Sequence, residues 1–143
     1  MTKSVPRCAM YIGVVGYLPP SEFDEKEALL RLQQSFDDID RRWPDQLKAV
    51  VSGLTDVGIH AIAYREAERR GWMTVGICCR RAFDHNLYPC AVKVFAGKDF
   101  GDDEEVRAFT KNLNCLVRIG DGPISRRITE QLRNEGLPIW EHD

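Results

Sequence analysis

Residues 51–59 read VSGLTDVGI, and this stretch joins a short apolar run to an amphipathic one. Residues 47–52 are largely apolar, as expected for a strand that is buried on both faces. After the stretch, Ile59, Ile62 and Ala67 fall at helical spacing, and Gly71 is placed to end that helix. A strand that leads straight into a helix through a glycine-containing turn predicts an α/β protein.

The same alternation continues in both directions along the chain. Ser21 followed by Asp24 has the spacing of a capping box, which marks the start of the first helix. Strands alternating with helices imply right-handed crossovers and a mostly parallel sheet with helices on both faces. We therefore predict one Rossmann-like, three-layer domain over residues 1–143, with no linker and no internal repeat. Strands are expected at residues 10–15, 47–52, 72–77, 91–95, 115–119 and 137–140, and helices at residues 23–42, 59–70, 102–112 and 124–135.

Composition narrows the possible partners. The chain has 143 residues, 43% of them hydrophobic, and a formal net charge of −2. Long nucleic acid is disfavoured, because a protein that neutralises many phosphates shows a basic excess. No stretch reaches the roughly 20 apolar residues of a membrane helix. The five irregularly spaced cysteines are typical of reduced thiols, so we expect a cytoplasmic protein.

Glycine-containing turns follow three of the predicted strands, at Gly16, at residues 53–58 and at residues 120–122. Ligands of such sheets bind outside the carboxyl ends of the strands. Glycine lets the backbone approach a ligand, and a helix N-terminus favours an anion. We therefore expect a phosphate-bearing small molecule over these turns.

The turn at residues 53–58 is the first candidate, since it runs from strand to helix and Thr55 adds a hydroxyl. It is neither a P-loop nor a dinucleotide fingerprint, and no cofactor is expected. The alternative is a purely structural turn in which Asp56 caps the helix. His60 can donate to a phosphate, but a capping or solvent-facing position is the simpler interpretation.

The second candidate is the segment from Gly120 to Arg127. Two arginines in a first helical turn oppose the helix dipole, which hints at a compensating anion near Arg126 or Arg127. The alternative is a pair of solvated surface arginines. Asp121 would repel a phosphate and could instead accept hydrogen bonds from a ribose hydroxyl.

A metal site is not expected. Cys78, Cys79, His85 and Cys90 share one loop, but adjacent cysteines do not match the usual zinc-ligand spacings. Buried, inert thiols are the simpler interpretation.

The segment at residues 51–59, together with residues 71–77 and 116–122, resembles the SLOG superfamily. That group includes the LOG phosphoribohydrolases, long labelled lysine decarboxylases, and the DNA-processing protein A family. The resemblance spans residues 10–140 and rests on the order and spacing of the motifs. It implies a homodimer that binds a nucleotide, a nucleoside monophosphate or a related ribosyl phosphate, with the phosphate near Thr55, Gly58 and Ser125. The ligand residues expected from the turns and the resemblance are Gly16, Tyr17, Gly53, Thr55, Asp56, Gly58, Ile59, Gly120, Asp121, Gly122, Ser125 and Arg126.

The alternative function is cleavage of an N-glycosidic bond, as in the LOG enzymes. Those enzymes use a glutamate three residues after the threonine of their glycine motif. Here Ser125 takes the threonine's place and Ile128 the glutamate's, while Glu130 lies about 200° around the helix from Ile128. Asp121, Asp56 or Asp84 would have to supply the carboxylate. The sequence therefore favours binding and leaves catalysis open.

Overall fold

The structure, a computed structural model, describes residues 9–18 and 22–143. Strands and helices alternate along the chain, as the sequence predicts. Ser21 lies outside the described residues, and Asp24 is the cap of the first helix: its Oδ1 accepts the N–H groups of Lys26 and Glu27. The strands are β1 (Met10–Gly16), β2 (Lys48–Ser52), β3 (Met73–Cys78), β4 (Val92–Phe95), β5 (Cys115–Ile119) and β6 (Ile139–His142), and the helices are α1 (Glu25–Arg42), α2 (Gly58–Arg69), the short 3₁₀ helix η1 (Arg80–Asp84), α3 (Asp103–Thr110) and α4 (Pro123–Asn134).

The six strands form one parallel sheet in the order β4-β3-β2-β1-β5-β6. The chain builds outward from β1 through β2, β3 and β4, and then returns to place β5 on the other side of β1. The loops after β1 and β5 therefore diverge at the carboxyl edge of the sheet. This switch point is where open α/β sheets have their ligand crevice.

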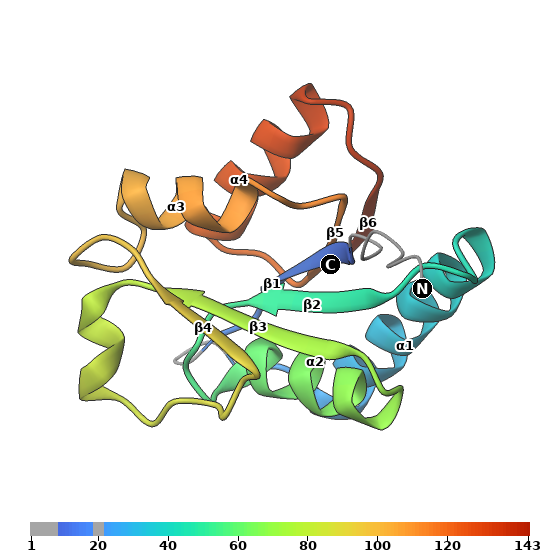
Figure 1. Cartoon of the computed structure of the whole chain (residues 1–143), viewed down its shortest axis with the longest axis horizontal. Coiled ribbons are helices and arrows are strands. Elements are labelled where there is room, and N and C mark those ends of the chain that lie inside the picture. The colour runs from blue at the N-terminus through green and yellow to red at the C-terminus, as the bar shows by residue number, and fades with distance from the viewer. Residues whose placement is uncertain (1–8, 19–21) are drawn as a thin grey trace, which may run out of the picture.

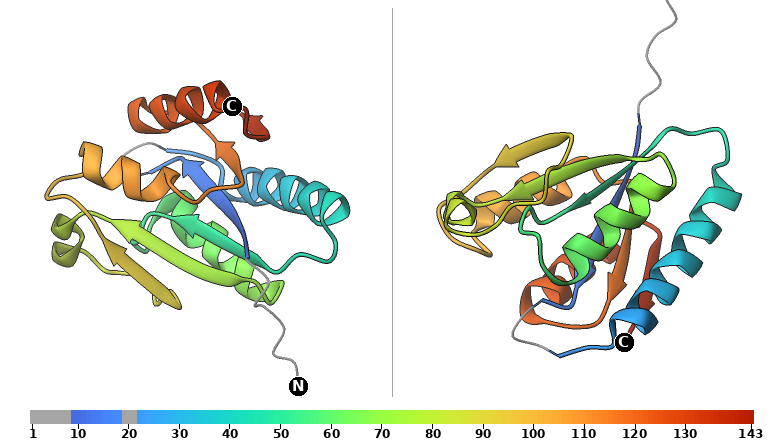
Figure 2. Two further views of the ribbon diagram at one scale, coloured as in Figure 1. Left: turned by 45° about the horizontal axis from the view of Figure 1, so that its top comes forward. Right: turned by 90° about the horizontal axis from the view of Figure 1, so that it is seen from below.

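Helices cover both faces of the sheet, as predicted (Figure 1). One layer, α1 and α2, packs Leu32, Phe36 and Ile59 against Ile12 and Val14 of β1. In the right-hand view of Figure 2 these two helices lie side by side over the same face. The other layer, α3 and α4, packs on the opposite face. None of the described helices is long and apolar enough to cross a membrane.

The opposite layer has its own core, in which Val106 and Phe109 of α3 and Leu132 of α4 meet Val51 and Leu116 of the sheet. Gly13 of β1 leaves room for Leu113 on this face, since an added Cβ would lie 2.6 Å from a methyl carbon of that side chain. Burial of both sheet faces accounts for the continuous apolar runs in the strands.

Tyr17 joins β1, β5 and α2 immediately after the first strand. Its N–H donates to the carbonyl of Ile119, 3.0 Å away, and its carbonyl accepts the N–H of Ile59 at 2.9 Å. Its ring covers Gly120, where an added Cβ would lie 2.5 Å from ring carbons. Gly58 lies at φ +54, and a Cβ there would be 2.5 Å from the Tyr17 carbonyl oxygen. These glycines allow three backbone segments to meet at one point, which positions the start of α2 beside the end of β1.

Candidate functional site

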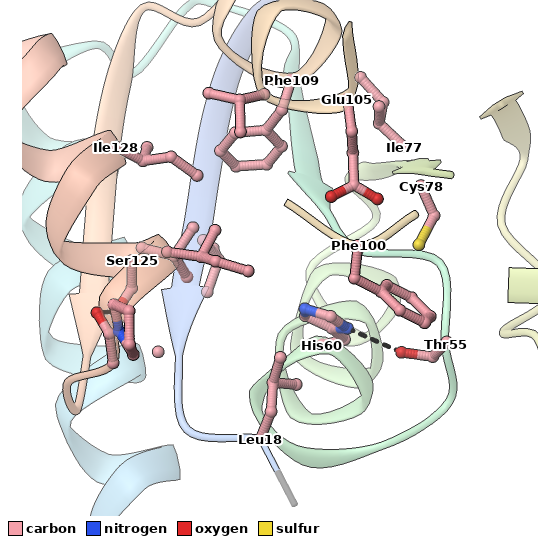
Figure 3. Close-up of a pocket in the computed structure, with 18 of the residues that line it drawn as sticks. Leu18, Thr55, His60, Ile77, Cys78, Phe100, Glu105, Phe109, Ser125 and Ile128 are labelled. Carbon is pink, nitrogen blue, oxygen red and sulfur yellow. Dashed lines mark hydrogen bonds between the residues drawn. The ribbon is translucent and has the colours of Figure 1, made fainter. Parts of the chain in front are cut away.

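A cavity of about 330 Å³ opens at the carboxyl edge of the sheet, over the switch point between β1 and β5 (Figure 3). The ends of β1, β2 and β3 form its floor, and α2, α3 and α4 supply side chains around it. The size falls in the range of small-molecule sites. Its lining residues are Val14, Val15, Gly16, Leu18, Gly53, Thr55, His60, Ile77, Cys78, Phe100, Glu105, Val106, Phe109, Asp121, Gly122, Pro123, Ile124, Ser125 and Ile128.

The structure divides the predicted ligand residues into two sets. The set that lines the cavity consists of Gly16, Gly53, Thr55, Asp121, Gly122 and Ser125. The remaining set, outside the lining, consists of Tyr17, Asp56, Gly58, Ile59, Gly120 and Arg126. Three turns thus meet at one cavity, while Gly58 and Gly120 of these turns pack closely against Tyr17.

The start of α2 has fewer free hydrogen-bond donors for an anion than expected for a helix N-terminus. The N–H of Ile59 is already engaged by the carbonyl of Tyr17. Asp56 does not cap the helix: the N-cap is Val57, which makes no side-chain cap hydrogen bond. The Asp56 carboxylate instead lies 3.8 Å from the guanidinium of Arg65, outside the cavity lining.

The start of α4 faces the cavity. Pro123 occupies the first helical position, and Gly122, Ile124 and Ser125 line the wall beside it. The N–H groups of a first helical turn have no partner within the helix, so those of Ile124 and Ser125 remain available to a ligand. The Ser125 hydroxyl donates to the Gly122 carbonyl at 3.0 Å and keeps its oxygen lone pairs for a further donor.

Asp121 lies at the rim of the cavity and forms an ion pair with Arg126. Its Oδ1 also accepts the N–H of Gly122 at 2.8 Å. The hydrogen bond from Arg126 holds the pKa of the Asp121 carboxyl below its usual value. Arg126 is thereby paired within the protein, while the neighbouring Arg127 turns to Asp103 of α3.

His60 neither caps α2 nor faces solvent, contrary to our interpretation of the sequence. Its imidazole lines the cavity, and its Nδ1 lies 3.2 Å from the Thr55 hydroxyl oxygen (Figure 3). Gly53 leaves the space for this ring, since a Cβ there would lie 2.1 Å from a ring carbon. Burial lowers the pKa of His60 to about 4, so the ring is neutral at pH 7.

Glu105 and Phe100 were not predicted, although both line the cavity. Glu105 belongs to the acidic first turn of α3, a pattern that usually complements the helix dipole in solvent. Its spacing of four residues from Phe109 is the signal that places both on one helix face. Figure 3 shows the Glu105 carboxylate entering the cavity from α3, on the side opposite His60 and Thr55.

Possible metal donors within the described residues gather at Cys78, Cys79 and Glu105, whose ligand atoms lie within 4.8 Å of one another. His85 and Cys90 of the same loop are not in this group. Burial raises the pKa of the Cys78 thiol to about 12 and also raises that of Cys79. Metal ions bind the thiolate, so this environment disfavours coordination.

The low pKa of His60 predicts a pH-dependent stability. Between pH 6.5 and 4 the unfolded chain binds a proton at His60 and the folded chain does not, so the free energy of unfolding falls as the pH falls. The full effect would be about 1.4 kcal/mol for each pH unit between 6.5 and 4.5. Because water can enter the cavity, we expect a smaller total loss of about 2 kcal/mol over this interval. Urea unfolding at pH 7.5 and 4.5 checks this. His60→Gln, which has no titrating ring, should lose less over the same interval, and an identical loss would contradict the assignment.

Comparison with protein-family models and with curated proteins finds no match to the sequence. Comparison with solved structures finds similar folds. The molybdenum cofactor carrier protein of Chlamydomonas reinhardtii superposes with a TM-score of 0.72 at 17% identity, covering 94% of this chain and 76% of that one. This chain has the fold of the carrier. The molybdenum cofactor binding protein of Rippkaea orientalis gives a TM-score of 0.71 at 14% identity, with coverage of 95% and 78%.

A third solved structure, the structural-genomics target TM1055, gives a TM-score of 0.65 at 21% identity and covers 91% of this chain and 72% of that one. At these identities the comparisons establish a shared architecture. The Rossmann-like parallel sheet expected from the SLOG resemblance is confirmed, and membership of that superfamily stays a prediction.

Proposed function

We propose that this protein binds a small ligand built from a flat ring and a single phosphate, such as a nucleoside monophosphate or a related ribosyl phosphate. The observation that carries the proposal is the make-up of one cavity. The N-terminal end of α4, with its unpaired N–H groups, lies on one side of the cavity. Aromatic and aliphatic side chains of α3 and the sheet line much of the rest. A ligand with one anionic end and one apolar, planar end complements this arrangement.

The phosphate is assigned to the start of α4. The N–H groups of Ile124 and Ser125 and the helix dipole favour an anion there. No lysine or arginine stands among the described residues that line the cavity, and the nearby Arg126 is paired with Asp121. A di- or triphosphate would find too little positive charge, which supports a single phosphate.

The ring is assigned to the part of the cavity lined by Phe100 and Phe109. Aromatic faces and apolar side chains stabilise a planar heterocycle by stacking and burial. Thr55 and neutral His60 provide hydroxyl and imidazole groups for the sugar or the ring.

Binding without turnover is the preferred form of the proposal. Ile128, which takes the place of the LOG glutamate, lines the cavity and leaves an apolar wall there. Asp121 keeps hydrolysis of the N-glycosidic bond as a second candidate, because an ionised carboxylate lies at the rim close to the proposed phosphate. Asp56, which lies outside the lining, no longer supports it.

The molybdenum cofactor is a second candidate ligand. Two solved structures of the same fold are named for carrying or binding it. It is a phosphorylated pterin, so it combines the flat ring and the single phosphate that the cavity favours. A carrier role for this chain would likewise need affinity and no bond cleavage.

The test is a panel of nucleoside mono-, di- and triphosphates, NAD and the molybdenum cofactor, scored by thermal shift and by chromatography for released base. We expect monophosphates or the cofactor to raise the melting temperature with no base released. Thr55→Ala should weaken binding about fivefold, the effect of one lost hydrogen bond near 1 kcal/mol. The control is Thr110→Ala, at a buried threonine outside the cavity lining. Released base would make the protein a hydrolase, and no shift with any ligand would refute the proposal.

A further inference from the structure

Glu105 is held in one orientation by two separate backbone segments. Its Oε2 accepts the N–H of Cys79 at 2.7 Å, and its Oε1 accepts the N–H of Gly101 at 2.8 Å. The first donor follows the end of β3 and the second precedes α3. The carboxylate is therefore fixed before any ligand arrives, with its remaining capacity directed at the cavity.

The charge of Glu105 has no partner of opposite sign in the described part of the chain. Glu105 takes part in none of the ion pairs formed among residues 9–18 and 22–143. His60, on the other side of the cavity, is neutral at pH 7 because burial lowers its pKa to about 4. A carboxylate in a mostly apolar cavity needs hydrogen-bond donors, so a ligand that displaces water from its free acceptor sites has to supply them.

The free acceptor sites of Glu105 form a pair. Each carboxylate oxygen has two lone pairs, and one on each oxygen is used by a backbone N–H. One acceptor site on each oxygen remains, which suits a ligand with two parallel N–H donors. Such two-point hydrogen bonds to a carboxylate are among the strongest and most selective in proteins.

We propose that Glu105 selects a ring in which an N–H stands next to an exocyclic NH₂ group, as in guanine and in pterins. This inference rests on the proposed function and names the class of ring that the cavity takes. Adenine presents a ring-nitrogen acceptor beside its NH₂ group, so its lone pair would face a carboxylate oxygen. Hypoxanthine keeps the N–H and lacks the NH₂ group. The expected order of affinity is therefore guanine, then hypoxanthine, then adenine.

The experiment is isothermal titration calorimetry of the full chain with GMP, IMP and AMP. We expect GMP to bind at least tenfold more tightly than AMP, with IMP between them. Glu105→Gln should weaken GMP at least tenfold and leave AMP unchanged or improved, since its amide offers one donor and one acceptor. Glu104→Gln is the matched control, because it removes the same charge from an exposed position of the same helical turn. It should leave all three affinities unchanged.

Guanosine and adenosine repeat the comparison without a phosphate, so an error in the phosphate site does not conceal the ring preference. Equal affinity for GMP and AMP in the natural protein would overturn the inference and leave the proposed function standing. An equal loss of GMP and AMP affinity in Glu105→Gln would also overturn it, because the side chain would then act only on the fold. Binding of neither GMP nor guanosine would overturn it as well. The ratio measured on the natural protein decides the matter even if Glu105→Gln does not fold.

Discussion

Replacing Gly16 by alanine is expected to lower the free energy of unfolding by about 4 kcal/mol, a loss typical of severe core defects. Gly16 ends β1 at φ +145, and an added Cβ would lie 1.7 Å from the carbonyl oxygen of Ile119. That oxygen belongs to the backbone of β5 and accepts the N–H of Tyr17. Neither strand can move aside without breaking its pairing, so the clash cannot be relieved by turning a side chain.

Gly71→Ala is the control for this substitution. Gly71 also has a positive φ, +74, but an added Cβ would find no atom within 4 Å. Alanine there should cost only the left-handed backbone conformation, about 1 kcal/mol. Urea unfolding of both variants separates the two causes. Equal losses would mean that the contact between Gly16 and Ile119 contributes nothing.

Replacing Gly122 by valine is expected to have the opposite pattern, with at least a thirtyfold loss of ligand affinity and a small loss of stability. At φ 178 this glycine is in extended backbone that any residue adopts, and an added Cβ would meet only the Ser125 hydroxyl, 3.6 Å away. A valine side chain would therefore extend into the cavity in front of the first turn of α4. A beta-branched residue at a helix cap costs about 1 kcal/mol of stability.

Gly122→Ala provides the graded comparison, because a single methyl group fills less of the space and should weaken binding only a few-fold. Calorimetry with the ligand found in the panel measures affinity, and urea unfolding measures stability. Unchanged affinity in Gly122→Val would place the phosphate away from α4 and would refute that part of the proposed function.

The architecture could be predicted from the sequence because it depends on patterns that are local. Continuous apolar runs indicated buried strands, and helical spacing of residues such as Ile59 and Ile62 indicated the covering helices. The parallel sheet and its two layers of helices followed from the alternation of the two. Boundaries differ by one to two residues at several strands, as at β3, expected at residues 72–77 and found at Met73–Cys78.

Only part of the candidate site could be predicted from such local patterns. Glycine-containing turns located the carboxyl edge of the sheet, and Gly53, Thr55 and Ser125 do line one cavity there. His60 and Glu105 were misjudged or missed, because the direction of a side chain near a helix start depends on how that helix is rotated against the sheet. That rotation is set by tertiary packing, such as the bonding of Tyr17 to Ile59 and the insertion of Phe109 into the core.

The position of β1 in the sheet has a consequence for synthesis of the protein. β1 pairs with β5 through residues about a hundred positions further along the chain, as in the pair Ile12 and Cys115. During translation β1, β2 and β3 leave the ribosome long before the strand that covers the other edge of β1. The cavity needs both the end of β1 and the loop that follows β5, so the nascent chain acquires its ligand site only in the last stage of folding. A ligand present in the cell would bind only the completed fold. It would therefore shift the last folding equilibrium toward the folded state by mass action.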